Sequence, residues 1–332
     1  MASLKLVRVE IQGFRQFRAP MALDLRDPAG APLEQFVLAG PNGSGKTTLL
    51  EAILLGLGQD DLLLRDAPGP RDSRALMGPQ AVVTVMLAEE GGPVHTLTRR
   101  EDGLKGRHPL AEGGDALHNA AQLQSLLVTL PVEYLSARRL PARVGPVQDE
   151  TRGRAPAPTE ANRIWTFKKR LRSQQGRRVP GYRGPEPRDE AWLARLNAFW
   201  REFRDDGTTF TLTLVEPDNL DRGDWDLFLY RGEERICAVD ALSSGEQEIL
   251  AMAVPFITEP FDGLLLIDEP EQHLHPQWQG RILRALRRLV PGAQVIVATH
   301  ADDPWDDAMS WERVLLVPPQ DPRAADTRGE GR

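Results

Sequence analysis

Apolar and polar positions along the chain follow two periods, and together they predict an α/β fold. Alternation with a period of two predicts strands at residues 4–11 and in a hairpin formed by 81–88 and 94–99. Other strands are expected from short apolar or strand-like runs at 36–39, 132–139, 209–215, 225–230, 264–268 and 294–299. Apolar residues at helical spacing predict helices at 48–56, 121–130, 192–203, after Ser244, and at 277–290.

Segments with few apolar positions divide this pattern into two lobes. Gly and His at 101–120 predict a loop, and Pro, Gly and Arg at 141–190 predict a basic linker. The expected parts are a discontinuous core lobe (1–110 and 240–318), an inserted helical lobe (111–239) and a disordered polar tail (319–332).

The composition excludes several classes of protein. The 332 residues carry a net charge of −7, which excludes a polybasic nucleic-acid coat, so DNA or RNA would need a local patch. Cys237 is the single cysteine, so no intrachain disulfide can form. The N-terminus is typical of a strand and not of a signal peptide, and the apolar runs are too short to cross a bilayer. We therefore expect a cytoplasmic protein without a membrane partner.

A glycine-rich segment directly after the apolar run 36–39 fits the pattern G-x-x-x-x-G-K-[ST]. Because the segment lies between a predicted strand and a predicted helix, its backbone N–H groups would converge on phosphate oxygens. The alternative is a glycine-rich turn in which the lysine occurs by chance. Lys46 would bridge the β- and γ-phosphates of ATP, and Thr47 would offer its hydroxyl to Mg²⁺. The candidate nucleotide-binding residues here are Gly40, Asn42, Gly43, Ser44, Gly45, Lys46, Thr47 and Thr48.

Two further segments complete the candidate chemistry. The apolar run 264–268 ends in Asp268, a candidate Mg²⁺ ligand, and Glu269 beside it is a candidate general base for the attacking water. A serine-glycine segment lies upstream, where a serine would cap a helix whose N-terminus faces an anion. Its candidate nucleotide-binding residues are Ser243, Ser244, Gly245 and Glu246.

These motifs, in this order, resemble those of the ABC ATPase superfamily. The segment Asp268-Glu269-Pro270-Glu271-Gln272-His273-Leu274-His275-Pro276 is similar to the DEPExHLHP run of RecF-like and overcoming-lysogeny-defect-like ATPases, as are IQGFRQF (11–17), LDL (23–25) and YLSARR (134–139). The resemblance implies an ABC-ATPase P-loop fold with a mixed-sheet lobe and an inserted helical lobe. It also implies a homodimer or higher homo-oligomer, in which the serine-glycine segment touches the nucleotide of the opposite subunit.

Other residues take candidate roles from the same resemblance. His300, after the run 295–299, would be a catalytic switch histidine near the γ-phosphate. Arg15 or Arg18 would contact the base or the α-phosphate, unless either is a solvated arginine. Gln80 and Gln122 are both open candidates for the family's Q-loop glutamine. His273 and His275 are either paired metal ligands or part of a loop at the dimer interface.

A basic stretch at 163–188 interleaves aromatic residues with nine basic ones and a single acid, Glu186. Such a patch can bind a phosphate backbone and stack on bases, but a solvated loop or a docking surface for an acidic partner has the same composition. The candidate nucleic-acid-binding residues are Arg163, Lys168, Lys169, Arg170, Arg172, Arg177 and Arg178.

The leading hypothesis is an ABC-type switch ATPase that dimerises around ATP. The chain ends 32 residues after His300, so we expect its effector, a nuclease or toxin, to be a separate protein in a Septu-like or retron-associated antiphage system. A RecF-like DNA repair or recombination ATPase is the alternative. The nucleotide-binding subunit of a transporter is disfavoured, because residues 48–242 separate the loop from the serine-glycine segment and the HLHP run is foreign to transporters.

Overall fold

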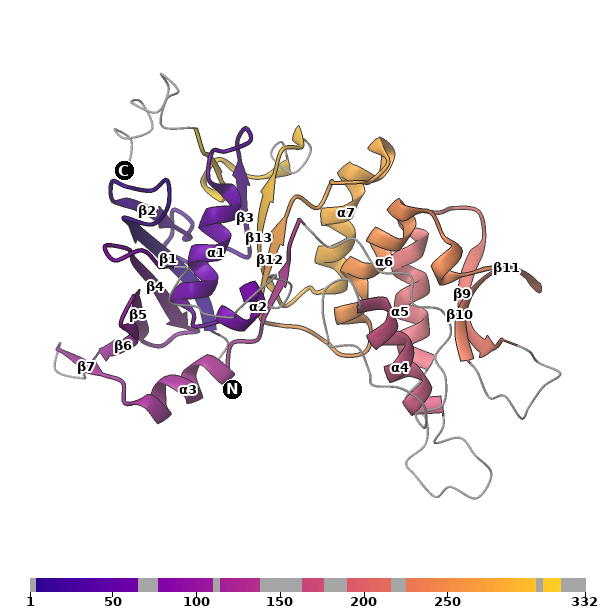
Figure 1. The fold of residues 1–332 in the computed structure, drawn as a ribbon, viewed down its shortest axis with the longest axis horizontal. Coiled ribbons are helices and arrows are strands. Elements are labelled where there is room, and N and C mark those ends of the chain that lie inside the picture. Colours follow the sequence, from indigo (N-terminus) through magenta and orange to yellow (C-terminus); the bar gives the residue numbers. More distant parts are fainter. Residues whose placement is uncertain are drawn as a thin grey trace. The chain divides into compact units, whose positions relative to one another are not determined.

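A computed structural model describes residues 4–64, 77–109, 114–137, 163–175, 190–215, 225–302 and 307–317 (Figure 1). Contacts divide the chain into two units: the first holds Met1–Ala137, Phe261–Glu271 and Gly292–Arg332, and the second holds Arg138–Pro260 and Gln272–Pro291. Residues 240–260 and 272–291 thus group with the insert, whereas the sequence pattern placed them in the core lobe. The reason is that their two helices pack on the helices of the insert.

Two sheets form the first unit. An antiparallel sheet has the order β2-β1-β4-β5-β6-β7, and a parallel sheet has the order β14-β3-β13-β12-β8. The antiparallel strands are β1 Leu4–Gln12, β2 Met21–Asp24, β4 Val82–Glu89, β5 Val94–Arg100, β6 Gly103–Pro109 and β7 Asp115–Leu117. The parallel strands are β3 Gln35–Ala39, β8 Val132–Leu135, β12 Leu264–Asp268, β13 Gln294–Thr299 and β14 Arg313–Leu315, which follows the 3₁₀ turn η5 Ser310–Glu312.

Helix α1 (Lys46–Gly56) lies between these two sheets (Figure 1). It contacts β4 and β5 on one side and β12 and β13 on the other. The helix is apolar nearly all round, which is the pattern of a helix covered on every side. The helices α2 (Asp60–Leu64) and α3 (Ala120–Val128) complete the described part of this unit. The start of α1, and with it the glycine-rich loop, is therefore anchored in the main hydrophobic core.

The second unit is a helical bundle with a small sheet. Helix α6 lies in contact with α4, α5 and α7, and the antiparallel strands have the order β11-β10-β9. The elements are α4 Arg163–Gln175, α5 Glu190–Arg201, β9 Thr208–Leu214, β10 Trp225–Arg231, β11 Glu234–Ala238, the 3₁₀ turn η4 Val239–Ala241, α6 Ser244–Ile257 and α7 Pro276–Leu289.

Most predicted elements are confirmed, and two predictions are wrong. The expected loop 101–120 contains β6 and β7, because β6 pairs with β5 and β7 pairs with β6, and Gly106 leaves room for His118 and Leu123 over the strand. The expected linker 141–190 contains α4, whose Ile164 and Phe167 are buried. Residues 141–162 and 176–189 of that linker and the tail 319–332 lie outside the described residues, and Glu190 begins α5. Among the helices that are described, none has the length and apolar character needed to span a membrane.

Candidate functional site

Three neighbouring parallel strands end at the same edge of the second sheet of the first unit. The strand β13 lies between β3 and β12, with Ala298 paired to both Leu38 and Asp268. The glycine-rich loop follows β3, His300 follows β13, and Glu269 follows β12. Ligands of α/β proteins bind at this end of parallel strands. The topology therefore brings together side chains that are far apart in the sequence.

The loop between β3 and α1 has the backbone geometry of an anion cradle. Gly40, Gly43 and Gly45 all have positive φ, at 149°, 78° and 106°. A Cβ on Gly45 would lie 2.6 Å from Gln16 Nε2, and one on Gly40 would lie 2.2 Å from the carbonyl oxygen of Leu316. Both positions therefore require glycine. Asn42 is exposed at the tip of the loop.

The buried hydroxyl of Ser44 tests whether this cradle fits a phosphate. Its Oγ is shielded from solvent and has no hydrogen-bond partner among the described residues. A buried hydroxyl without a partner is costly, and a phosphate oxygen would supply an acceptor. The donor set of the loop therefore suits a bound polyphosphate.

Lys46 is only 4% exposed at the start of α1. Its Nζ donates to the carbonyl oxygens of Gly40 at 2.8 Å and Pro41 at 3.3 Å, and lies 2.9 Å from His300 Nε2. Burial lowers the pKa of Lys46 below its usual value, while nearby carboxylates, first that of Glu269, oppose the shift. An incoming phosphate would replace the two carbonyl contacts with stronger, charge-assisted ones.

Thr47 and Asp268 form the oxygen pair expected of a Mg²⁺ site. The Thr47 hydroxyl donates to Asp268 Oδ2 at 2.8 Å, and the Asp268 residue is 1% exposed. Oxygen ligands at one or two positions, with the rest supplied by phosphate and water, are what Mg²⁺ prefers. These two residues fit the metal, and they are the ones that the sequence assigned to it.

Glu269 is held in an unusual backbone conformation directly after β12. Its φ is 48°, and its N–H donates to the carbonyl oxygen of Ala298 at 2.7 Å. A non-glycine residue in this region is strained, and such residues cluster at functional sites. Its Oε1 lies 3.1 Å from His300 Nε2.

A single nitrogen of His300 thus faces both an ammonium and a carboxylate. Nε2 can accept from Lys46 only when it carries no proton, and it can donate to Glu269 only when it does. Nε2 can therefore make only one of these two hydrogen bonds at a time, while Nδ1 lies 3.5 Å from the same Lys46 Nζ. The histidine therefore links the charge of the loop to that of the carboxylate.

Two residues of the site carry no obvious signal in the sequence. Glu271 Oε1 accepts from the backbone N–H of His300 at 2.6 Å, which fixes the histidine at the end of β13. Gln16 Oε1 accepts from the Thr48 hydroxyl at 3.1 Å and packs against Gly45. The glutamate lies within the motif 268–276, and the glutamine within IQGFRQF, but spacing alone assigns a role to neither.

Arg15 lies close to this part of the unit but has a partner of its own. It forms an ion pair with Glu51 of α1, its guanidinium lies 5.2 Å from the ring centre of Phe14, and its φ is 48°. The backbone N–H of Arg18 donates to the carbonyl oxygen of Gln16. The contact of either arginine with a nucleotide stays a prediction.

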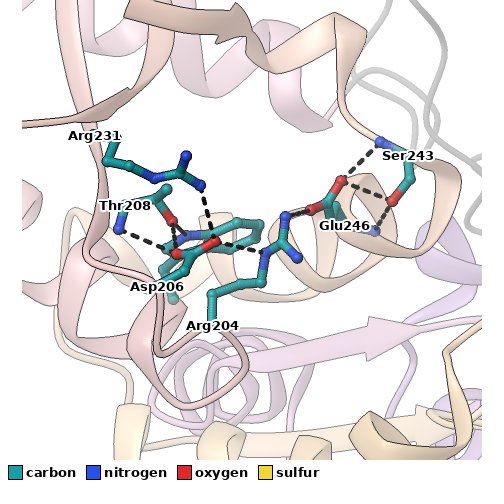
Figure 2. A network of polar contacts seen from close by, with 7 residues as sticks. Arg204, Asp206, Thr208, Arg231, Ser243 and Glu246 are labelled. Atoms are coloured by element: carbon teal, nitrogen blue, oxygen red, sulfur yellow. Dashed lines mark hydrogen bonds and ion pairs between the residues drawn. The ribbon is translucent and has the colours of Figure 1, made fainter. Parts of the chain in front are cut away.

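The serine-glycine segment starts α6 in the second unit, where Ser243 is the N-cap. The Ser243 hydroxyl donates to Glu246 Oε2 at 2.7 Å, and its N–H donates to the same oxygen at 2.9 Å. Glu246 in turn binds Arg204 at 2.7 Å. Asp206 and Arg231 extend this network (Figure 2). Ser243 is therefore held by its own helix, and Ser244 beside it is exposed.

Gly245 is buried under the segment that leads into α7. A Cβ at this position would lie 3.2 Å from the carbonyl oxygen of His273 and 3.6 Å from the Trp278 ring. The glycine thus serves close packing within the second unit. Contact of Ser244 and Gly245 with a nucleotide of another subunit stays a prediction.

Comparison with known proteins identifies the type of fold. Two family models match: one described as "AAA domain, putative AbiEii toxin, Type IV TA system" matches residues 157–302, and one described as "AAA domain" matches residues 8–75. The solved structure of an SMC head bound to the C-terminal winged-helix domain of ScpA aligns with 92% of this chain and 92% of its own, at a TM-score of 0.59 and 17% identity. The chain has the P-loop fold of SMC heads.

Curated relatives match over shorter segments. Septu protein PtuA of Bacillus thuringiensis is 44% identical over 43 residues, which is 13% of this chain and 11% of that protein. The "Retron Ec83 probable ATPase" of Escherichia coli is 34% identical over 94 residues, 25% of this chain and 17% of that protein. The matched segments of this chain span 11% and 17% of the length of these relatives. Over these segments the chain is similar to Septu and retron ATPases, and both partial family models describe AAA domains.

The structure contradicts part of the predicted nucleic-acid patch. Lys168 is 1% exposed, and its Nζ lies 2.6 Å from both Asp226 Oδ1 and Asp240 Oδ2. Arg163 is 9% exposed. Neither residue presents its charge at the surface, because α4 turns them toward the core of the second unit. Lys169 is partly exposed and lies over the Trp165 ring at 5.4 Å. Arg177 and Arg178, and the side chains of Arg170 and Arg172, lie outside the description.

Two other open assignments change in the structure. His275 caps α7 by accepting from the Gln277 N–H at 3.3 Å, and the described residues contain no group of three His, Cys, Asp or Glu placed to hold a metal. Gln122 belongs to the capping box of α3, since its side chain accepts from the Asn119 N–H at 2.9 Å. A capping role explains both residues without a ligand.

Proposed function

We propose that this chain is an ATP-binding and ATP-hydrolysing switch that dimerises around ATP. The observation that carries the proposal is the convergence of Lys46, Thr47, Asp268, Glu269 and His300 at one edge of a parallel sheet, beside a glycine cradle. These are the parts that phosphoryl transfer requires: a phosphate clamp, an oxygen pair for Mg²⁺ and a carboxylate base.

Each side chain has a stated task in this scheme. Backbone N–H groups of the loop and Lys46 bind the phosphates, and Thr47 and Asp268 hold Mg²⁺, which neutralises charge on the phosphate oxygens when bound. Glu269 accepts the proton of the attacking water. His300, held by Glu271, exchanges its contact with Lys46 for one with Glu269 as the charge at the loop changes.

The second half of the proposal concerns the subunit arrangement. Ser244 and Gly245 of the partner subunit would close the nucleotide site of the first, and the reverse would hold by twofold symmetry. The positive end of a helix dipole and an exposed serine suit a phosphate. ATP would thus join two faces, and hydrolysis would release them.

For the biological role, we propose the ATPase part of a prokaryotic antiphage defence system that controls a separate nuclease or toxin. Similarity over short segments to Septu PtuA and to a retron ATPase supports this choice, and a repair or recombination ATPase is the alternative. The partner is expected to be another protein, and DNA or RNA stays an open ligand of the complex.

Lys46→Ala tests the proposed function. We expect ATP hydrolysis by the purified chain to fall by about 100-fold or more, because the clamp on the transferring phosphoryl group is lost. Lys105→Ala removes an exposed lysine of the same unit and is the matched control.

The same pair of variants separates the two biological roles. In cells that carry the native locus, Lys46→Ala should abolish protection against phage, whereas Lys105→Ala should keep it. Absence of protection by the wild-type locus would contradict the defence role, and unchanged protection with lost hydrolysis would show that defence does not depend on hydrolysis. Sensitivity of the Lys46→Ala cells to DNA damage, with no effect on phage, would favour repair.

A further inference from the structure

One face of α7 carries a row of exposed arginines. The helix buries its apolar positions Ile282, Leu283, Ala285 and Leu286 against its own unit. The exposed arginines on the remaining positions are Arg281, Arg284, Arg287 and Arg288. This separation of apolar and charged residues fixes the direction of the guanidinium groups, which point away from the core.

A hollow of about 520 Å³ lies where α7 meets the end of α5. Its lining consists of Ala198, Arg201, Glu202, Arg281 and Arg284, all within the second unit. Arg281 donates to the backbone carbonyl of Glu202 at 3.3 Å, and Arg288 donates to Glu202 Oε1 at 2.7 Å. Glu202 therefore orients two arginines of α7 at the edge of the hollow.

The charge of this surface opposes that of the whole chain. Three arginines, Arg201, Arg281 and Arg284, line the hollow with a single carboxylate, Glu202. Arg287 and Arg288 are exposed on the same helix, while the chain carries a net charge of −7. A polyanion repelled by the rest of the molecule would be attracted here, because exposed charges act within about a Debye length of 10 Å.

We propose that this arginine groove, formed by the end of α5 and the exposed face of α7, binds the phosphodiester backbone of a nucleic acid. Guanidinium groups match phosphate oxygens in bidentate geometry. The only apolar residue in its lining is Ala198, whereas a protein interface needs apolar or aromatic anchors at its centre. A groove that is basic and polar is the kind that nucleic acid covers.

The spacing of the arginines along α7 agrees with contact to the phosphates of one strand of a duplex. Arg281 and Arg288 are seven residues apart, so they lie roughly 10 Å apart along the helix axis. One strand of a duplex rises about 3.4 Å along the duplex axis per phosphate, so a row of this length can reach more than one phosphate of a strand. Such binding would not depend on the base sequence. It would need no bound nucleotide, so it is a function separate from ATP hydrolysis.

Arg281→Gln with Arg284→Gln tests the proposal in the full chain without nucleotide. The probe is a fluorescently labelled DNA duplex, followed by anisotropy between about 50 and 200 mM KCl. We expect the double variant to bind roughly ten-fold more weakly or worse, and the slope of log K against log salt to decrease by about two. The same anisotropy measurement is repeated with single-stranded DNA and with RNA of equal length.

The matched control is Arg100→Gln with Arg107→Gln, two exposed arginines of the antiparallel sheet in the other unit. This control should bind the duplex as the wild type does, and thermal unfolding should be unchanged in both double variants. Failure of the wild type to bind any of the three nucleic acids, or equal losses in groove and control variants, would overturn the proposal. Binding of polyglutamate but not of nucleic acid would overturn it in favour of an acidic protein.

Discussion

Glu269→Gln should bind ATP with near wild-type affinity and hydrolyse it about 10²- to 10⁴-fold more slowly, the range that a general base contributes. The amide cannot accept the proton of the attacking water, but it keeps the size and position of the carboxylate. If hydrolysis releases the two subunits, this variant should also accumulate an ATP-held dimer. Single-turnover hydrolysis and light scattering after size exclusion measure the two effects separately.

Glu34→Gln is the control, since Glu34 is an exposed glutamate of the same unit and the chemical change is identical. It should hydrolyse ATP at the wild-type rate. Near wild-type hydrolysis by Glu269→Gln would show that Glu269 is not the base. Glu271, which binds the backbone of His300 at 2.6 Å, would then be the next carboxylate to replace.

Lys168→Met should lower the free energy of unfolding of the second unit by about 3–5 kcal/mol, because it leaves two carboxylates without their shared cation. The lysine lies between Asp226 and Asp240, and its side chain is fully buried. Asp240 belongs to the turn η4, whose carbonyl groups also accept from Gln247 of α6. The loss should therefore also loosen the start of α6.

Urea unfolding followed by tryptophan fluorescence measures this effect, since Trp192, Trp200 and Trp278 lie in the same unit. Lys105→Met is the control: its pair with Asp102 is about two-thirds exposed, and such pairs contribute about 0–1 kcal/mol. Adding Asp226→Asn and Asp240→Asn to Lys168→Met should recover part of the loss. A change in the single variant no larger than that of the control would contradict a buried ion triad.

Local sequence pattern predicted which side chains lie at the strand ends because these positions depend on chain connectivity. The loop at 40–47 had to follow β3, and Asp268 had to end a strand buried on both faces. Once β3, β13 and β12 are neighbours in a parallel sheet, Lys46, Asp268 and His300 must meet. The local pattern therefore identified Lys46 and Asp268 as candidates, and the family resemblance added His300.

Residues that act through tertiary neighbours could not be found in this way. Lys168 belongs to a strongly basic stretch, and only the packing of α4 shows that its charge is buried. The positive φ of Glu269 depends on the hydrogen bond of its N–H to Ala298 on the adjacent strand. The arginine groove needs α5 and α7 side by side, and more than 70 residues separate Arg201 from Arg281 in the sequence.

Mixing two inactive variants tests most directly whether each ATP site is shared between subunits. Lys46→Ala removes the phosphate clamp, and Ser244→Arg blocks the surface that should face the partner's nucleotide. In a shared arrangement, a dimer with one subunit of each kind has one damaged site and one intact site. We expect an equimolar mixture to recover about a quarter of the wild-type hydrolysis, because half of the dimers are mixed and each has one working site of two. Activity no greater than the average of the separate variants would mean that each chain hydrolyses ATP alone.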